Sequence, residues 1–279
     1  MKNDKCDGKG CNGQDCSGQD CSGCEAGAVK PAMELSRIGG CVAVMSGKGG
    51  VGKSLVTGLL AVGLRRQGRK AGILDADITG PSIPKMFGVG ERPATKDFGI
   101  LPVRSRSGID IMSLNLFMEN EDDPVIWRGP MISNAVRQFW EEVVWGDLDY
   151  LLLDLPPGTA DVALTVMQVL PLKGVVIVMS PQDLTVMIVK KAIKMADMLK
   201  IPVLGLIENM SYIVCPGCNE EVEVFGPSRG AETAASQNIP FWGRLPIDPA
   251  LAALCDSGRI EDYDDGFPLS LARHLTGEG

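Results

Sequence analysis

The sequence predicts an α/β fold with a doubly wound, mostly parallel β-sheet and helices on both of its faces. The first observation is that short, mainly apolar runs alternate with longer amphipathic runs along residues 41–245. Parallel strands that are buried on both faces and connected by crossover helices produce this alternation. The second observation is that glycine-rich or acidic turns follow several of the apolar runs. Such turns emerge at the carboxyl edge of a parallel sheet, where ligands bind.

The apolar runs that we expect to form strands are short and are bounded by turn residues. They lie at 41–46, 71–75, 149–154, 174–179, 203–208 and 241–245. Helices fit between these runs at about 53–67, 130–144, 160–169, 183–199 and 229–238. A β-hairpin insertion is predicted at residues 100–114, where Ser-Arg-Ser-Gly separates two alternating runs. No linker divides residues 33–279, so we expect them to form one domain.

Composition and charge exclude several classes of protein. The 279 residues carry a net charge of −8, whereas a broad surface for nucleic acid or for an anionic membrane requires positive charge. No apolar run approaches the ~18 residues of a membrane span. Residues 1–30 are polar and glycine-rich, whereas a secretory signal needs about 7 to 15 apolar residues. We therefore expect a cytoplasmic protein that binds neither nucleic acid nor membrane, and whose nine cysteines are metal ligands or buried thiols.

Residues 1–32 form a cysteine-rich segment that we call the tail. It consists mainly of Gly, Asp, Gln, Ser and Lys and has almost nothing that could pack a core, so we expect it to be flexible and to precede the domain at 33–279. Four of its cysteines recur every five residues and the fifth follows at a CxxC spacing. These tail cysteines are Cys6, Cys11, Cys16, Cys21 and Cys24.

Residues 47–54, with the sequence Gly-Lys-Gly-Gly-Val-Gly-Lys-Ser, match the consensus of a phosphate-binding loop between a strand and a helix. Glycines let backbone N–H groups turn toward phosphate oxygens, and the helix N-terminus adds its partial positive charge. We expect Lys53 to reach the β and γ phosphates and Ser54 to ligate Mg²⁺. The alternative is a glycine-rich turn with chance lysines. The predicted nucleotide-binding residues are Gly47, Lys48, Gly49, Gly50, Val51, Gly52, Lys53 and Ser54.

Lys48 is unusual because a second lysine in the loop can hardly serve the same phosphates as Lys53, but it could cross to the nucleotide of a partner. The loop resembles the deviant Walker A motif of the MinD/Mrp/nitrogenase iron-protein group, in which this lysine acts in trans across a nucleotide-bridged dimer. The resemblance implies that Lys48 is catalytic, because it would neutralise charge in the partner's site as an arginine finger does. Hydrolysis would then depend on dimerisation. A solvated loop lysine is the alternative.

Two acidic turns follow predicted strands. Asp75 and Asp77 end the second strand, and Asp154 ends an apolar run in the Walker B arrangement. The turns resemble switch I and switch II of the same group. The resemblance implies that Asp77 positions the attacking water, that Asp75 and Asp154 hold waters of the Mg²⁺ shell, and that Asn209 contacts the adenine. Taken singly, each of these residues could instead be a helix cap or turn residue.

Cys215-Pro-Gly-Cys218 places two thiolates in a tight turn, where they can chelate one ion or two corners of a cluster. A [4Fe-4S] cluster or a structural Zn²⁺ usually has four ligands, and a symmetric dimer would supply both cysteines twice at its two-fold axis. A redox-active pair and a structural zinc knuckle remain alternatives. Cys41 and Cys255 lie in a predicted strand and on an apolar helix face, so we expect buried thiols there.

Several motifs occur in an order that resembles the Mrp/ApbC iron-sulfur carrier ATPases across residues 41–250. They are the deviant Walker A loop, DADITGPS at 75–82, WRGP at 127–130, DLPPGT at 154–159, ENMSY at 208–212 and CPGC at 215–218. The resemblance implies a homodimer that binds and hydrolyses ATP with Mg²⁺, bridges a labile [4Fe-4S] cluster through the CxxC and passes it to apo-proteins. The residues alone indicate a dimer-dependent nucleotide switch with a thiolate metal site.

The tail departs from the pattern of this family. Longer members carry four N-terminal cysteines with one long gap before a CxxC, whereas the gaps here are four, four, four and two residues. We expect a second cluster in the tail, with Cys21 and Cys24 among its ligands. A disordered, thiol-rich segment that buffers metal is the alternative.

Three other functions share parts of these motifs. A positioning ATPase of the MinD or ParA kind needs a membrane or DNA surface, but residues 255–279 end without a basic amphipathic run, and the CxxC would have no role. A reductase like the nitrogenase iron protein bridges its cluster with two cysteines that are far apart in sequence. An ATP-gated metal-cluster scaffold with a structural Zn²⁺ is the third alternative.

Overall fold

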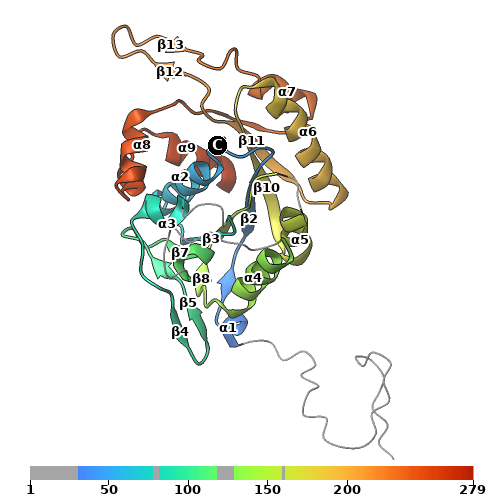
Figure 1. Ribbon diagram of the computed structural model, residues 1–279, viewed down its shortest axis with the longest axis vertical. Helices are drawn as coiled ribbons and strands as arrows, with labels where there is room; N and C mark the ends of the chain where they lie inside the picture. Colours follow the sequence, from blue (N-terminus) through green and yellow to red (C-terminus); the bar gives the residue numbers. More distant parts are fainter. Residues whose placement is uncertain (1–30, 78–81, 118–128, 159–160, 279) are drawn as a thin grey trace, which may run out of the picture.

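A central β-sheet of eight strands organises the computed structural model, which describes residues 31–77, 82–117, 129–158 and 161–278 (Figure 1). The strand order is β14-β11-β10-β2-β9-β3-β7-β6. All neighbours are parallel except β6 and β7. The strands are β2 (Cys41–Ser46), β3 (Ala71–Asp75), β6 (Val103–Arg104), β7 (Asp110–Ser113), β9 (Tyr150–Asp154), β10 (Leu172–Met179), β11 (Val203–Glu208) and β14 (Phe241–Arg244).

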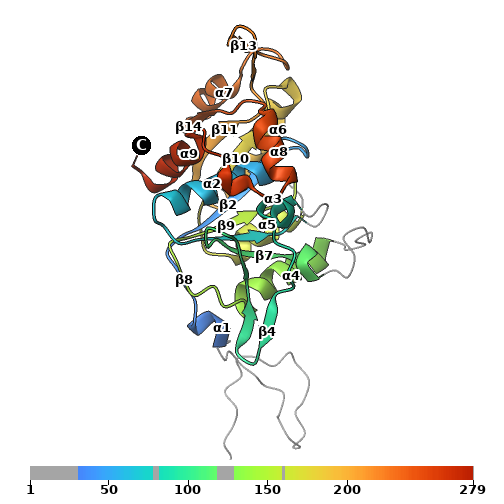
Figure 2. The same ribbon diagram turned by 90° about the vertical axis from the view of Figure 1, so that its left-hand side faces the viewer.

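Helices cover both faces of this sheet, as Figures 1 and 2 show. Helices α4 (Gly129–Glu142), α5 (Asp161–Val169), α6 (Asp183–Met198) and α7 (Gly230–Ser236) contribute to the core on one face. Helices α2 (Lys53–Arg66), α3 (Ser82–Phe87), α8 (Pro249–Asp256) and α9 (Phe267–Thr276) contribute to the core on the other face. The predicted fold class, a doubly wound α/β P-loop fold, is therefore confirmed.

Strand β2 shows why the apolar runs form the centre of the sheet. Its side chains alternate between the two cores, because successive side chains of a strand point to opposite faces. Cys41, Ala43 and Met45 enter the core under α4 to α7, while Val42 and Val44 enter the core under α2. A strand covered on both faces must be apolar at nearly every position.

The predicted hairpin at residues 100–114 is confirmed in part: β6 and β7 pair antiparallel across residues 105–108, but the hairpin is not an insertion outside the main sheet. Strand β7 is a strand of the main sheet, paired in parallel with β3, and β6 pairs antiparallel to β7 at the edge. Residues at the start of the predicted hairpin belong to a separate ladder of β4 (Ala94–Lys96) with β5 (Gly99–Leu101). The alternating pattern arose because Asp110 and Ser113 are polar although both are buried. Each has a polar partner, Arg104 and Asp75 respectively.

Short elements complete the described part of the chain. Helix α1 (Pro31–Glu34) contacts α4, and Ala32 is buried. Strands β1 (Arg37–Ile38) and β8 (Asp147–Leu148) form a small parallel ladder. Strands β12 (Ile213–Val214) and β13 (Glu221–Val222) form an antiparallel hairpin that projects from the body at the end opposite β4 and β5 (Figures 1 and 2). None of the helices in the described ranges has the length and apolar character needed to cross a membrane.

Candidate functional site

The phosphate loop connects β2 to α2 at the carboxyl edge of the sheet. Gly50 and Gly52 have φ angles of 79° and 78°, in the left-handed region that favours glycine. A Cβ atom at Gly52 would collide with the amide nitrogen of Asn209, and one at Gly47 would collide with Ile188. These glycines are therefore required by backbone conformation and by close packing at the start of α2.

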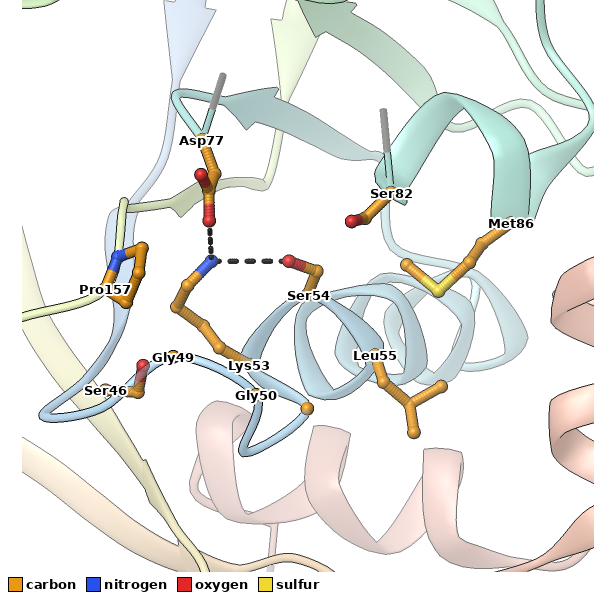
Figure 3. Close-up of a pocket in the computed structure, with 11 residues that line it drawn as sticks. Ser46, Gly49, Gly50, Lys53, Ser54, Leu55, Asp77, Ser82, Met86 and Pro157 are labelled. Carbon is orange, nitrogen blue, oxygen red and sulfur yellow. Dashed lines mark hydrogen bonds and ion pairs between the residues drawn. The ribbon is translucent and has the colours of Figure 1, made fainter. Parts of the chain in front are cut away.

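Lys53 is the central cation of the site. Its side chain is only 5% exposed, and its ammonium lies 2.8 Å from Asp154 Oδ1 and 3.5 Å from Asp77 Oδ2. Figure 3 shows this ammonium pointing toward Asp77 and Ser54 above the loop. A buried charge requires such partners because burial removes its hydration. The structure thus brings together the predicted phosphate-binding lysine and two of the predicted carboxylates.

Asp154, at the end of β9, is fully buried and accepts hydrogen bonds from two hydroxyls of helix α2. Ser54 Oγ lies 2.5 Å from its Oδ2 atom and Thr57 Oγ1 lies 2.9 Å from its Oδ1 atom. Thr57 was not predicted as a site residue. Its position one helical turn after Lys53 is the sequence signal that could have identified it.

Asp75 lies beside Asp154 because the two residues are register partners on the adjacent strands β3 and β9. The Asp75 carboxylate accepts hydrogen bonds from Ser113 Oγ at 2.9 Å and from the backbone N–H of Asp77 at 3.0 Å. Burial, and secondarily the neighbouring negative charge of Asp154, raise the pKa of Asp75 well above its usual value. The hydrogen bond from Ser113 opposes this shift. Sequence reasoning missed Ser113 because it assigned residues 100–114 to an insertion and not to the main sheet.

These oxygen atoms form a donor set that fits Mg²⁺. Mg²⁺ prefers carboxylate, hydroxyl and water oxygens, and Ser54, Asp75 and Asp154 converge at the ends of three neighbouring elements. Burial raises the pKa of Asp75, and repulsion by the adjacent carboxylate of Asp154 adds to that shift. A divalent cation would relieve that repulsion.

A cavity of about 380 Å³ lies over the loop. Loop residues, Lys53, Ser54, Asp77 and Pro157 line one part of it, and Ser82 and Met86 of α3 line another (Figure 3). Neither α3 residue was predicted as a site residue. Ser82 ends the DADITGPS motif at 75–82, which could have identified it, whereas no motif includes Met86. Asp77 is on the cavity wall, where it can contact a bound molecule.

Lys48 and Asn209 are placed differently from the residues that line the cavity. The Lys48 side chain is exposed, and its ammonium donates to Gln182 Oε1 at 3.3 Å, before the start of α6. Asn209 is 1% exposed, and its side-chain amide donates to the carbonyl of Val51 at 2.9 Å. The trans role of Lys48 and the adenine contact of Asn209 stay predictions, and the structure adds that Asn209 holds the phosphate loop.

Cys215 and Cys218 occupy the turn of the β12–β13 hairpin. The backbone closes this turn with bonds from Cys215 N to Glu220 O and from Asn219 N to Cys215 O, both 2.9 Å long. The backbone N–H groups of Cys218 and Gly217 and the thiol of Cys218 lower the pKa of Cys215. Cys218 is exposed and Cys215 is half-buried. The turn therefore presents a pair of sulfur ligands to solvent, one of them favoured as a thiolate.

Of the other two cysteines among the described residues, Cys41 is buried, as predicted, whereas Cys255 is only half-buried. Burial raises the pKa of Cys41, and burial together with Asp256 raises the pKa of Cys255 to about 11. Within residues 31–278 and outside the gaps given above, no group of three or more His, Cys, Asp or Glu side chains is arranged to hold a metal ion. The CxxC thus has two ligands in one chain.

Some predicted features lie outside the described residues. They are the tail cysteines with the proposed ligands Cys21 and Cys24, the start of the WRGP motif at Trp127 and Arg128, residues 78–81 of the first acidic turn and Thr159 of the second.

Comparisons with known proteins identify the family. A family model described as ParA, the NUBPL iron-transfer P-loop NTPases, matches residues 37–267. The chain is 47% identical over 236 residues to an iron-sulfur cluster carrier protein of Clostridium perfringens, and the match covers 82% of this chain and 83% of that protein.

Two solved structures are similar to this chain to different degrees. A nucleotide-binding protein of Archaeoglobus fulgidus, solved with ADP and cobalt, is 46% identical with a TM-score of 0.75, covering 86% of this chain and 93% of that one. The cell division ATPase MinD of Pyrococcus furiosus has a TM-score of 0.64, covering 86% of this chain and 100% of that one, but is only 19% identical, so it shares the fold alone. The chain therefore belongs to the NUBPL iron-transfer family of P-loop NTPases, and it is similar to iron-sulfur cluster carrier proteins over most of its length.

Proposed function

We propose that this chain is an ATP-dependent iron-sulfur cluster carrier whose homodimer bridges a [4Fe-4S] cluster and transfers it to apo-proteins. The observation that carries the proposal is the exposed Cys215–Cys218 turn, which projects from the same edge of the sheet as the phosphate loop. A cubane cluster has four iron corners to ligate, and this turn supplies two sulfurs. A second copy related by a two-fold axis would supply the other two.

The nucleotide site would supply the ATPase step. Lys53 is the group that would neutralise the β and γ phosphates, and Ser54, Asp75 and Asp154 would hold Mg²⁺ directly or through water. When bound, Mg²⁺ neutralises charge that develops on the phosphates. Asp77 faces the cavity beside Lys53, where it would orient the attacking water.

Dimerisation would complete catalysis as well as cluster binding. Lys48 is exposed and donates to Gln182 rather than joining Lys53 in the cavity. A lysine in this position can leave its own loop and reach the nucleotide of a facing copy, where it would stabilise negative charge in the transition state. Hydrolysis by a single chain would then be slow and would accelerate in the dimer.

The tail is proposed as a second metal-binding region. Its cysteines lie at 6, 11, 16, 21 and 24, before the domain at 33–279. Five thiols exceed the four ligands of one cubane, and the CxxC-spaced Cys21 and Cys24 are the proposed core of that site. Its cluster would be independent of the bridging cluster, because the two sets of cysteines are separate.

The test is anaerobic reconstitution with iron and sulfide, comparing three forms of the full chain. The first is the wild type, the second has the five tail cysteines replaced by serine, and the third has Cys215→Ser and Cys218→Ser added to the second. We expect about two iron atoms per monomer in a dimer of the second form, none in the third, and a surplus in the wild type.

Two results would contradict the carrier proposal. Equal iron in the second and third forms would show that the hairpin does not bind the cluster. Binding of zinc alone would favour a nucleotide switch with a structural metal site, because thiolates by themselves do not select iron. Transfer is then tested by incubating the loaded dimer with an apo-protein that needs a [4Fe-4S] cluster, with and without Mg²⁺ and ATP.

A further inference from the structure

Glu208, the last residue of β11, is a fully buried carboxylate that the ATPase site does not use. Its Oε2 atom accepts hydrogen bonds from Ser211 Oγ at 2.7 Å and Ser228 Oγ at 2.6 Å. Its Oε1 atom accepts from the backbone N–H groups of Arg229 and Gly230, both at 2.8 Å. Four donors compensate for the loss of hydration that burial imposes on this group.

The four hydrogen-bond donors to Glu208 come from the two ends of the segment 211–230, which leaves the body of the protein and returns to it. Ser211 lies just before β12, where the chain leaves the body, and Ser228 lies after β13, where the chain returns to begin α7. Cys215 and Cys218 lie at the turn between these points. One carboxylate therefore ties together both ends of the segment that presents the two sulfurs.

Arg244 connects the same segment to the neighbouring strand. It is the register partner of Glu208 on β14, and its Nε donates to Ser211 Oγ at 2.8 Å. Its guanidinium also lies over the Tyr212 ring, 4.8 Å from the ring centroid. The planar guanidinium suits this combination of stacking and directional donation better than an ammonium would.

The guanidinium of Arg244 also reaches the returning strand of the hairpin. Its Nη1 and Nη2 atoms lie 3.4 Å and 3.1 Å from carboxylate oxygens of Glu221 and Glu223. Those ion pairs are partly exposed, so each alone stabilises little. Their significance is geometric, because they hold β13 to the same arginine that holds Ser211.

The residue next to Glu208 contacts the phosphate loop. Asn209 is 1% exposed and donates through its side-chain amide to the carbonyl of Val51. Its backbone N–H donates to Met179 O of β10 at 2.8 Å. Two consecutive residues at the end of β11 thus contact the loop on one side and the base of the hairpin on the other.

We propose that Glu208 and Arg244 are positioning residues that couple occupancy of the phosphate loop to the placement of the Cys215–Cys218 turn. A shift of the loop at Val51 would move Asn209, and with it the Glu208 carboxylate that holds both ends of the hairpin. Coupling of this kind is a free energy shared between two sites and is reciprocal. The inference rests on the proposed role of the cysteine pair in binding metal.

The coupling can be measured with Co²⁺ as the probe, since thiolate ligation of Co²⁺ gives a charge-transfer absorption band. The full chain with its five tail cysteines changed to serine is titrated anaerobically in excess Mg²⁺, with and without a non-hydrolysable ATP analogue. We expect the two Co²⁺ affinities to differ by at least about fivefold. Saturating Co²⁺ must change the affinity for the analogue by the same factor.

Two variants should bring the ratio of the Co²⁺ affinities measured with and without the ATP analogue closer to one. Arg244→Lys keeps the positive charge but loses the planar contacts, and Ser228→Ala removes one bond at the returning end of the hairpin. Neither touches the phosphate cavity, so affinity for the analogue without Co²⁺ should stay at the wild-type value. Arg104→Gln is the matched control. It removes another arginine ion pair at the end of a strand, that of Arg104 Nε on the edge strand β6 with Asp110 Oδ1 at 2.8 Å.

The outcomes separate this inference from the proposed function. If both variants keep the wild-type ratio, Glu208 and Arg244 only anchor the fold. A cobalt band that depends on Cys215 but has the same affinity in both nucleotide states would also overturn the coupling, while leaving the metal site intact. The absence of any band that depends on Cys215 would instead overturn the cysteine site, and the inference with it.

Discussion

The phosphate site and the CxxC hairpin differ in how far one chain completes them. At the phosphate site the charges are buried and paired within the chain: Lys53 contacts Asp154 and Asp77, and hydroxyls of α2 satisfy Asp154. The hairpin has two-residue strands, an exposed Cys218 and a half-buried Cys215. The first site is preorganised, whereas the second has two of the four ligands that a cluster needs.

This difference has a physical origin. Buried charges in a medium of low dielectric must be paired when the chain folds, so the nucleotide site is built as part of the core. Sulfur atoms that water reaches need no charged partner within the chain, so the hairpin can fold before metal binds. We therefore expect nucleotide binding to be a property of one chain and cluster binding to be a property of two.

The largest expected effect is that of Lys53→Ala. The substitution removes the phosphate-binding cation and leaves Asp154 buried without its ion-pair partner, so nucleotide binding should be abolished. The free energy of unfolding should fall by about 3 kcal/mol, the usual effect of breaking a buried pair. Calorimetric titration with ATP and denaturant unfolding measure the two effects. Metal binding at the hairpin should persist, and unchanged ATP affinity would contradict the assignment of Lys53.

The opposite pair of effects, loss of metal with nucleotide binding kept, is expected for Cys215→Ala in the chain that lacks tail cysteines. The bridging cluster should be lost completely, because one thiolate per chain cannot supply four ligands to a dimer. ATP affinity should remain at the wild-type value. Iron and sulfide analysis measures the first effect, and Cys255→Ala serves as a control that should keep its iron. Retention of iron in Cys215→Ala would show that Cys215 is not a ligand of the bridging cluster.

Lys48→Ala tests whether the nucleotide site also needs a second chain. We expect ATP binding to persist and the hydrolysis rate of the dimer to fall about 100-fold, as for loss of one donor to a developing negative charge. Mixing this variant with Asp77→Asn should restore roughly a quarter of the wild-type rate, because half of the dimers would contain one complete site. If the mixture stays inactive, Lys48 acts on the nucleotide of its own chain.

The smallest expected effect concerns the repulsion between Asp75 and Asp154. Because burial and Asp154 raise the folded-state pKa of Asp75, ionisation of Asp75 destabilises the fold as pH rises above its unfolded value of about 3.9. Without Mg²⁺ and nucleotide, Asp75→Asn should therefore raise the melting temperature at pH 7 by about 2–4 °C.

This gain should disappear at about pH 4 or below, where the wild-type carboxyl is protonated as well. Thermal unfolding at both pH values measures the difference. Stabilisation by Mg²⁺ with nucleotide should be weaker in Asp75→Asn than in the wild type. A lower melting temperature of the variant at pH 7 would show that the Asp75 charge stabilises the fold.

Much of the fold could be predicted because its central strands are apolar on both faces. All six residues of β2 are buried, and such a strand can be identified from a short apolar run alone. Strand β7 could not be identified in this way. Its buried Asp110 and Ser113 are satisfied by Arg104 and Asp75, and one of these partners lies 38 positions away.

The sequence by itself determined the phosphate loop, the acidic strand ends and the CxxC, because each depends on backbone conformation and chemistry within a few neighbouring residues. Only the tertiary structure decided which groups surround them. Strand pairing brings Asp75 beside Asp154 and Arg244 beside Glu208. Ser211 and Ser228, which donate hydrogen bonds to Glu208, come from opposite ends of the hairpin segment. Contacts between distant positions leave no spacing signal along the chain, since they arise from the order of strands in the sheet.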